Sequence, residues 1–131
     1  MRVLIDTHTF LWFVSSPLKL NRTALLLVGD DTTHLQISIA SIWEISIKSS
    51  RGKLSVNGGF KNVENRLVEN GIEILPIIFA HTFEHNSLPF HHKDPFDRMI
   101  AAQAIFEGID LVSEDDVFDL YFAGTNVKRI W

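Results

Sequence analysis

The stretch VLIDTHTFLW (residues 3–12) introduces the pattern that decides the fold. Its three leading apolar residues run without interruption to Asp6, which is typical of a strand buried on both faces of a parallel sheet. The residues that follow, HTFLWFVSS (8–16), have helical spacing, and Pro17 is predicted to end that helix. A buried strand followed directly by a helix indicates the start of an α/β domain.

The same alternation continues along the chain. Further strands are predicted over 35–38, 72–75 and 109–113, with a last edge strand over 126–130. Helices are predicted over 21–30, 39–53, 60–70, 77–89 and 95–107, with Asn21 capping the first of these and Gly108 ending the last. This order predicts a three-layer α/β/α fold around a central, mainly parallel sheet, because right-handed crossovers place helices on both faces.

Length and composition limit the class of protein. A chain of 131 residues suits a single domain, 1–131, with one core. Its 46% hydrophobic and 21% charged residues are an ordinary globular balance. The absence of cysteine excludes disulfides and thiolate metal sites. Apolar stretches such as TFLWFV are too short to span a bilayer, so we expect a cytoplasmic protein that makes no use of a membrane.

The net charge of −4 argues mildly against a protein that grips nucleic acid with a generally basic surface. This objection weakens if several acids are committed to a metal ion. Setting four carboxylates aside leaves twelve acids against twelve bases. Composition therefore leaves nucleic-acid binding open.

Several acids stand at strand ends or helix starts, where ligands bind in α/β sheets. Asp6 follows the first strand, and an N-cap role and a functional role are equally supported. Glu44 has a structural interpretation, because Ser41 with Glu44 spells a capping box and Lys48 lies one turn further on. Taken alone, each has an explanation that needs no ligand.

Two further acid positions lie in the second half of the chain. In DPFDRMIAAQA (94–104), Asp94 and Pro95 are typical of a helix start. Asp97 then falls in the first turn, where an acid complements the helix dipole. In SEDD (113–116), Asp115 and Asp116 follow a buried strand, in a turn that favours aspartate.

Considered together, these acids suggest more. If they converge, their like charges raise one another's pKa unless a cation lies among them. Oxygen ligands without cysteine suit Mg²⁺ or Mn²⁺, which support phosphoryl chemistry by activating water and neutralising charge on the phosphate.

Four blocks of the sequence resemble the PIN-domain family, and within it the VapC-type toxins of bacterial toxin–antitoxin pairs. They are VLIDTHTFLW (3–12), ISIASIWEISIKSSRGKL (37–54), LPFHHKDPFDRMIAAQA (88–104) and LVSEDDVF (111–118). The resemblance covers essentially the whole chain, and the third block is the most specific.

The resemblance implies a three-layer α/β/α fold and Mg²⁺- or Mn²⁺-dependent hydrolysis of RNA. It also implies a homodimer and a cognate antitoxin that blocks the enzyme. Carried over by position, the family's acids fall on Asp6, Glu44, Asp97 and Asp115, the last through a Ser/Thr-x-Asp pattern that begins at Ser113. Asp6, Asp97 and Asp115 would hold the metal, and Glu44 would complete the shell or orient the attacking water. Asp116 remains an alternative to Asp115.

The remaining histidines and cations have competing interpretations. His81 and His85 lie one helical turn apart, but surface histidines are favoured over a zinc site, and His91 and His92 are interpreted as architectural. Arg98 is predicted to pair with a neighbouring acid.

A basic patch and an aromatic cluster complete the candidate features. Lys48, Arg51 and Lys53 could equally hold RNA phosphates or complement a helix C-terminus. The aromatic cluster of Phe10, Trp12 and Phe13 is expected to be mostly core, with any exposed part contacting a partner helix rather than stacking on RNA bases.

Other functions are less well supported. A receiver-type phosphoacceptor needs paired acids after the first strand, whereas Thr7 follows Asp6. A haloacid-dehalogenase-like phosphatase needs D-x-D there, and His8 stands in the second position. A non-catalytic PIN-like module that binds RNA or protein is the main alternative, and the complete set of four acids disfavours it.

Overall fold

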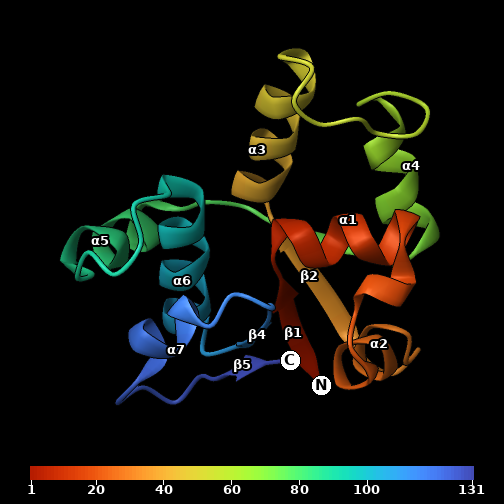
Figure 1. The fold of residues 1–131 in the computed structure, drawn as a ribbon. Coiled ribbons are helices and arrows are strands. Elements are labelled where there is room, and N and C mark those ends of the chain that lie inside the picture. Colours follow the sequence, from red (N-terminus) through yellow and green to blue (C-terminus); the bar gives the residue numbers. More distant parts are fainter.

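The computed structural model describes residues 1–131 and contains one five-stranded sheet in the order β3-β2-β1-β4-β5 (Figure 1). The strands are β1 (Arg2–Ile5), β2 (His34–Ser38), β3 (Glu73–Leu75), β4 (Asp110–Val112) and β5 (Arg129–Ile130). Every pairing is parallel, so the predicted mainly parallel sheet is confirmed, with β5 as the predicted edge strand.

Seven α-helices and one short 3₁₀ helix connect the strands. They are α1 (Thr7–Ser15), η1 (Pro17–Lys19), α2 (Arg22–Val28), α3 (Ile39–Ser50), α4 (Asn62–Glu69), α5 (Phe79–Ser87), α6 (Pro95–Glu107) and α7 (Val117–Phe122). The sequence did not predict α7, because a helix of six residues is too short to show an apolar periodicity.

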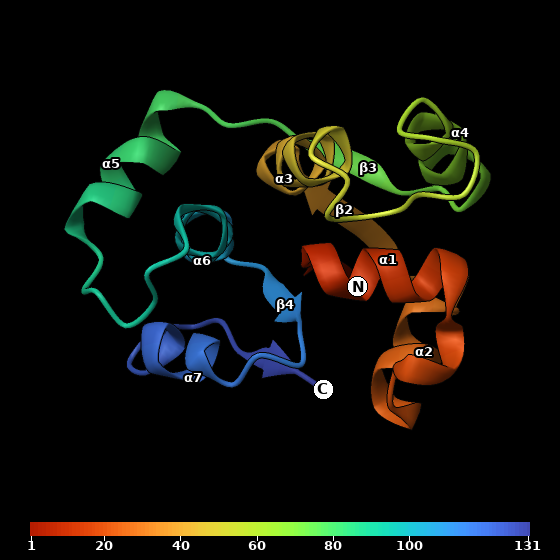
Figure 2. The same ribbon diagram turned by 45° about the horizontal axis from the view of Figure 1, so that its top comes forward.

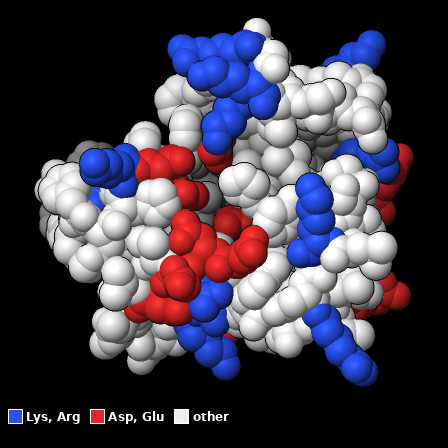
Figure 3. Space-filling model, viewed as in Figure 1, with Lys and Arg blue, Asp and Glu red and all other residues white.

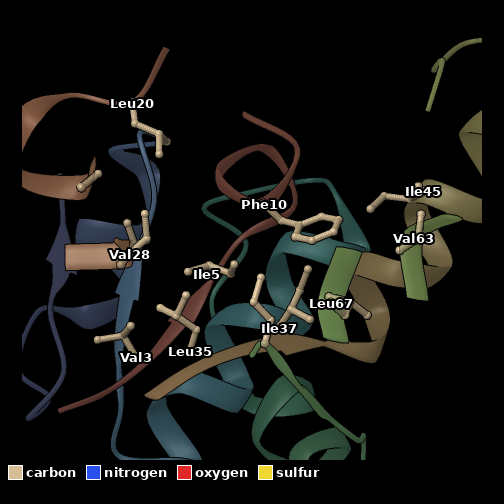
Figure 4. Packing of buried hydrophobic residues seen from close by; sticks show 13 residues of the cluster. Val3, Ile5, Phe10, Leu20, Val28, Leu35, Ile37, Ile45, Val63 and Leu67 are labelled. Carbon is tan, nitrogen blue, oxygen red and sulfur yellow. The ribbon is translucent and has the colours of Figure 1, made fainter. Parts of the chain in front are cut away.

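The helices cover both faces of the sheet (Figure 2). Alternation along β1 explains the two cores, because Val3 and Ile5 point to one face and Leu4 points to the other. The first core joins β1 and β2 to α1, α2 and α4, as the packed side chains in Figure 4 show. The second core is formed mainly by α6 and α7. The α/β/α layering is therefore confirmed.

Helix α3 begins at Ile39, as predicted, and ends at Ser50, three residues before its predicted end. Ser38 is its N-cap and accepts a hydrogen bond from the backbone N–H of Ala40. The predicted capping box of Ser41 and Glu44 is wrong, because β2 passes directly into α3 and leaves Ser41 buried inside the helix. At its other side α3 meets α6, where Trp43 and Phe96 form an edge-to-face aromatic pair with centroids 5.5 Å apart.

Other helix ends agree with their predicted signals. The side chain of Asn21 caps α2 and that of Asp94 caps α6. Gly108 ends α6 with a φ of 66°, in the left-handed region that glycine adopts without strain. None of the helices has both the length and the apolar character needed to cross a lipid bilayer.

Candidate functional site

Acidic side chains gather at the carboxyl ends of β1 and β4, in the centre of the face shown in Figure 3. The ends meet because Ile5 and Val112 are paired in register, which places the residues that follow them at one rim of the sheet. A hollow of about 520 Å³ opens there. It is lined by Asp6, His8, Trp12, Glu114, Asp115 and Asp116.

Asp6 is both a helix cap and a member of this hollow. Its Oδ1 accepts a hydrogen bond from the backbone N–H of Thr9 at 2.9 Å, and its Oδ2 accepts one from the Ser113 hydroxyl at 2.5 Å. Burial raises the pKa of Asp6, and the hydrogen bonds from Ser113 and Thr9 oppose that rise. The capping role is thus observed, and it leaves the carboxylate at the wall of the hollow.

Asp97 and Asp115 come together around a histidine. The Nε2 atom of His92 lies 3.1 Å from Oδ2 of Asp97 and 3.1 Å from Oδ2 of Asp115. One ligand atom from each of the three residues lies within 4.8 Å of the others. The group joins the first turn of α6 to the segment between β4 and α7. Such a convergence of Asp97 with an acid of the SEDD turn was considered in the sequence analysis.

The pKa of Asp97 is raised from 3.8 to about 7. Burial is the largest cause, and the negative charges of Asp94, Asp6 and Glu44 add to it, while His92 acts in the opposite direction. The Asp97 carboxylate is therefore held in a buried place where neighbouring negative charges repel it. Such a carboxyl is a favourable place for a cation to bind.

The two aspartates of the SEDD turn differ in their surroundings. The Asp115 backbone N–H donates to the Ser113 hydroxyl, and its Oδ1 accepts from the backbone N–H of Val117. Asp116 is exposed at the start of α7 and makes no capping hydrogen bond with its side chain. Both line the hollow, but Asp115 is the one that contacts His92.

Glu44 lies apart from the cluster around His92. Its buried carboxylate accepts hydrogen bonds from the Thr7 hydroxyl and from Lys48 Nζ, both at 2.6 Å. The predicted pairing with Lys48 is confirmed, and it raises the pKa of Lys48. Thr7 follows Asp6 directly, so the hydrogen bond from Thr7 connects Glu44 to the residue next to Asp6 in the hollow. The four predicted acids therefore surround one region without all touching.

His92 is the site residue that the sequence analysis missed, since it treated the 91–92 pair as architectural. The available signal was its place two residues before Asp94, which caps the start of the helix that carries Asp97. The other paired histidines are elsewhere: Nδ1 of His81 accepts from the Ile78 backbone, and its Nε2 meets Glu107 at 3.0 Å.

Arg98 does not make the predicted ion pair. Its guanidinium is buried and donates to the backbone carbonyls of His85, Leu88 and Pro89 and to the Tyr121 hydroxyl. Successive residues of a helix differ in direction by about 100°. Arg98 therefore points toward Tyr121 and the segment before α6, while Asp97, one residue earlier, faces His92.

Residues 3–121 match the sequence family described as PIN domain. The chain belongs to the PIN-domain family. The match includes all the site residues: Asp6, Glu44, His92, Asp97 and Asp115. No protein with a curated description matches the sequence.

Solved structures share the fold of this PIN domain at low sequence identity. VapBC2 from Rickettsia felis, bound to a DNA fragment from its promoter, has a TM-score of 0.70 at 17% identity, with 100% of each chain covered. VapBC-1 from nontypeable Haemophilus influenzae has a TM-score of 0.65 at 13% identity, with 98% of each chain covered. FitAcB from Neisseria gonorrhoeae has a TM-score of 0.60 at 20% identity, with 98% of this chain and 96% of that chain covered.

The donor atoms of this PIN domain suit a hard divalent cation. Asp6, Asp97 and Asp115 offer carboxylate oxygens at one rim of the sheet, and there is no cysteine to favour a softer metal. Burial is the main cause of the raised pKa of Asp97, and a cation there would offset the repulsion from neighbouring acids that adds to it. The residues present therefore fit Mg²⁺ or Mn²⁺.

Proposed function

We propose that the chain is a metal-dependent endoribonuclease and the toxin of a VapC-type toxin–antitoxin pair. The observation that supports it best is Asp97, a carboxyl whose pKa is raised to about 7 and which lies near Asp115, one of the acids that line the open hollow. The resemblance to VapC-type toxins supports the same reading. So do the names of the structural relatives, one of which is described as a member of the VapBC family of toxin–antitoxin systems.

In this proposal, Asp6, Asp97 and Asp115 hold Mg²⁺ or Mn²⁺. When bound, the ion lowers the pKa of a water molecule and offsets negative charge on the phosphate. Asp6 is fixed for this role by Thr9 and Ser113. Glu44 completes the shell or orients the attacking water, and the Thr7 hydroxyl holds its Oε1 atom in place.

RNA would approach across the tip of α3. Figure 3 shows basic side chains over that tip, next to the acidic hollow, and the chain has Lys48, Arg51 and Lys53 there. Lys48 is paired with Glu44, whereas Arg51 and Lys53 are exposed. Positive charges beside the acidic hollow would contact phosphates next to the scissile bond. We therefore assign phosphate binding to Arg51 and Lys53.

The proposal includes protein partners in the cytoplasm. A cognate antitoxin would bind the chain and block it, and two copies would form a homodimer. Phe10 is buried, whereas Trp12 and Phe13 on α1 are partly exposed. Their exposed surface remains our predicted contact for a partner helix. Sedimentation velocity of the purified chain tests the homodimer, because a single species with the mass of one chain would contradict it.

The deciding experiment is cleavage of a mixed RNA pool by the purified protein with Mg²⁺, with Mn²⁺ or with EDTA. We expect cleavage only with metal, and its loss in the Asp6→Asn/Asp97→Asn double variant. An Asp31→Asn/Glu64→Gln double variant is the matched control, because both of its acids are exposed and lie outside the hollow. Cleavage that survives EDTA or the first double variant would rule out this site.

The alternative is a PIN module that binds RNA or protein without cutting. It would share the fold and the hollow but would not need a cation. If no RNA in the pool is cut, the shift of the melting temperature with Mn²⁺ separates the two readings. A shift that disappears in the Asp6→Asn/Asp97→Asn variant supports a metal enzyme with a narrow target, and its absence supports the non-catalytic module.

A further inference from the structure

His92 bridges two carboxylates that come from different parts of the chain. Its Nε2 atom lies 3.1 Å from Asp97 in α6 and 3.1 Å from Asp115 beyond β4. Two roles fit these distances: a metal ligand, or a hydrogen-bond donor that holds the acids in position. The other nitrogen of the ring decides between them.

We propose that His92 is a positioning residue, whose Nε2–H group donates to Asp115 and lies against the Asp97 carboxylate, so that it orients the two acids for the cation, and that His92 does not itself bind the metal. This inference rests on the proposed function only for the identity of what the two acids hold. The arrangement of the hydrogen bonds stands on the geometry of the chain.

The Nδ1 atom of His92 lies 3.1 Å from the backbone nitrogen of Asp94. A backbone N–H can only donate, so Nδ1 must accept with its lone pair. In a neutral imidazole the proton then resides on Nε2, which has no lone pair left for a metal. Histidines that bind metals usually show the reverse arrangement, in which the second nitrogen donates to a carbonyl or a carboxylate.

The backbone around His92 is held as firmly as its ring. The N–H of His92 donates to the Tyr121 hydroxyl at 2.8 Å. The same hydroxyl accepts from Arg98 at 3.3 Å, and Arg98 also donates to the Pro89 carbonyl at 2.7 Å. These hydrogen bonds connect the segment before α6 to α6, which carries Asp97, and to α7, which follows Asp115 in the chain. Turning the ring would break the contact of Nδ1 with Asp94 and the contacts of Nε2 with the two acids.

This network explains how two like charges are kept side by side. An N–H group placed between two carboxylates reduces their repulsion, and here it fixes the direction of one Asp115 oxygen by a hydrogen bond. Asp115 is further fixed by the Val117 N–H, which its second oxygen accepts. His92 thus does for the acids what outer hydrogen-bond partners do in metal sites, where their loss typically weakens metal binding 10- to 100-fold.

The tautomer can be measured directly on the whole chain. Histidine labelled with ¹⁵N and a long-range ¹H–¹⁵N correlation spectrum distinguish the two neutral tautomers, first in EDTA and then with saturating Mg²⁺. We expect the Nε2–H tautomer for His92 in both conditions, with the His92→Gln spectrum providing the assignment. A proton on Nδ1 in either condition would overturn the proposal.

Bound Mn²⁺ provides the second measurement. Pulsed EPR of wild-type protein should show no nitrogen bound directly to the ion, and direct coupling to an imidazole nitrogen would overturn the proposal. We expect His92→Ala to weaken Mn²⁺ binding roughly 10- to 100-fold in calorimetric titration. His92→Gln, which keeps an N–H donor at a similar reach, should recover most of that loss. Equal affinity in His92→Ala and wild type would also contradict a positioning role.

His91→Gln is the matched control, because His91 packs on the ring of Tyr121 and is not part of the His92–Asp97–Asp115 group. Its Mn²⁺ affinity should match that of wild type. Thermal unfolding in EDTA shows whether each variant is folded. If wild type binds no Mn²⁺, the proposed function fails, whereas the tautomer measured in EDTA still tests the hydrogen bonding of His92.

Discussion

The hydroxyl of Ser113 donates a hydrogen bond to Oδ2 of Asp6 at 2.5 Å, although the two residues are 107 positions apart. They follow β4 and β1, which are neighbours in the sheet. The same hydroxyl accepts from the backbone N–H of Asp115 at 3.1 Å. One serine therefore links the acids that stand at the ends of two parallel strands.

Ser113→Ala is expected to lower the stability of the metal-free protein at neutral pH. The buried Asp6 would lose a donor that favours its charged form, at a cost of about 1.5–3 kcal/mol. Urea unfolding in EDTA measures this free energy. Ser87→Ala serves as the control, because Ser87 is exposed and contacts only the local Glu84 carbonyl. Equal losses in both variants would mean that the Asp6 contact contributes nothing.

The elevated pKa of Asp97 predicts a pH-dependent stability. The folded-state pKa of about 7 lies above the ordinary value of 3.8, so the fold favours the protonated carboxyl. In EDTA, stability should therefore fall as pH rises between about 4 and 7. Asp97→Asn removes this loss, and its advantage over wild type above pH 7 can approach roughly 4 kcal/mol.

Melting temperatures of wild type and Asp97→Asn across that range measure the effect. The two curves should meet at low pH and separate as pH rises. Added Mg²⁺ should narrow the gap by stabilising wild type alone, since the variant lacks the charge. Parallel curves would show that Asp97 titrates normally in the folded chain.

Lys48 competes with a cation for the charge of Glu44. Its Nζ lies 2.6 Å from Oε2 of Glu44, and its pKa is raised by that contact and by the charges of Asp94 and Asp97. Lys48→Met should tighten Mn²⁺ binding several-fold, because it removes a positive charge from beside the site. Calorimetric titration measures the affinity, with Lys53→Met as the control. Weaker binding in Lys48→Met would mean that Lys48 positions Glu44 rather than competing for its charge.

Arg98 is expected to be a stability residue rather than a substrate contact. Arg98→Met removes the donor that serves three backbone carbonyls and one of the two donors to the Tyr121 hydroxyl, at a cost of about 2–4 kcal/mol in urea unfolding. Arg66→Met removes only a surface ion pair of 3.9 Å with Glu69 and should change stability by less than about 1 kcal/mol. Similar values for the two variants would contradict this assignment.

Sequence alone predicted the layers, because they depend on local signals. An apolar run before Asp6 indicates a buried strand, and Asp94 with Pro95 indicates where a helix begins. These signals span only a few residues, so they can be recognised without knowledge of the rest of the fold. The capping box at Ser41 failed for the same reason, since a local motif cannot show that β2 continues into α3 without a break.

The site depended on contacts between distant segments. Sequence supplied Asp6, Glu44, Asp97 and Asp115 as candidates, but their separation and the raised pKa of Asp97 follow from how the sheet and α6 pack. The role of His92 became visible only in three dimensions, because the N–H of Asp94 fixes one ring nitrogen while two acids from different elements meet the other. Hydrogen-bond direction and charge repulsion act across space, so only the tertiary structure decided them.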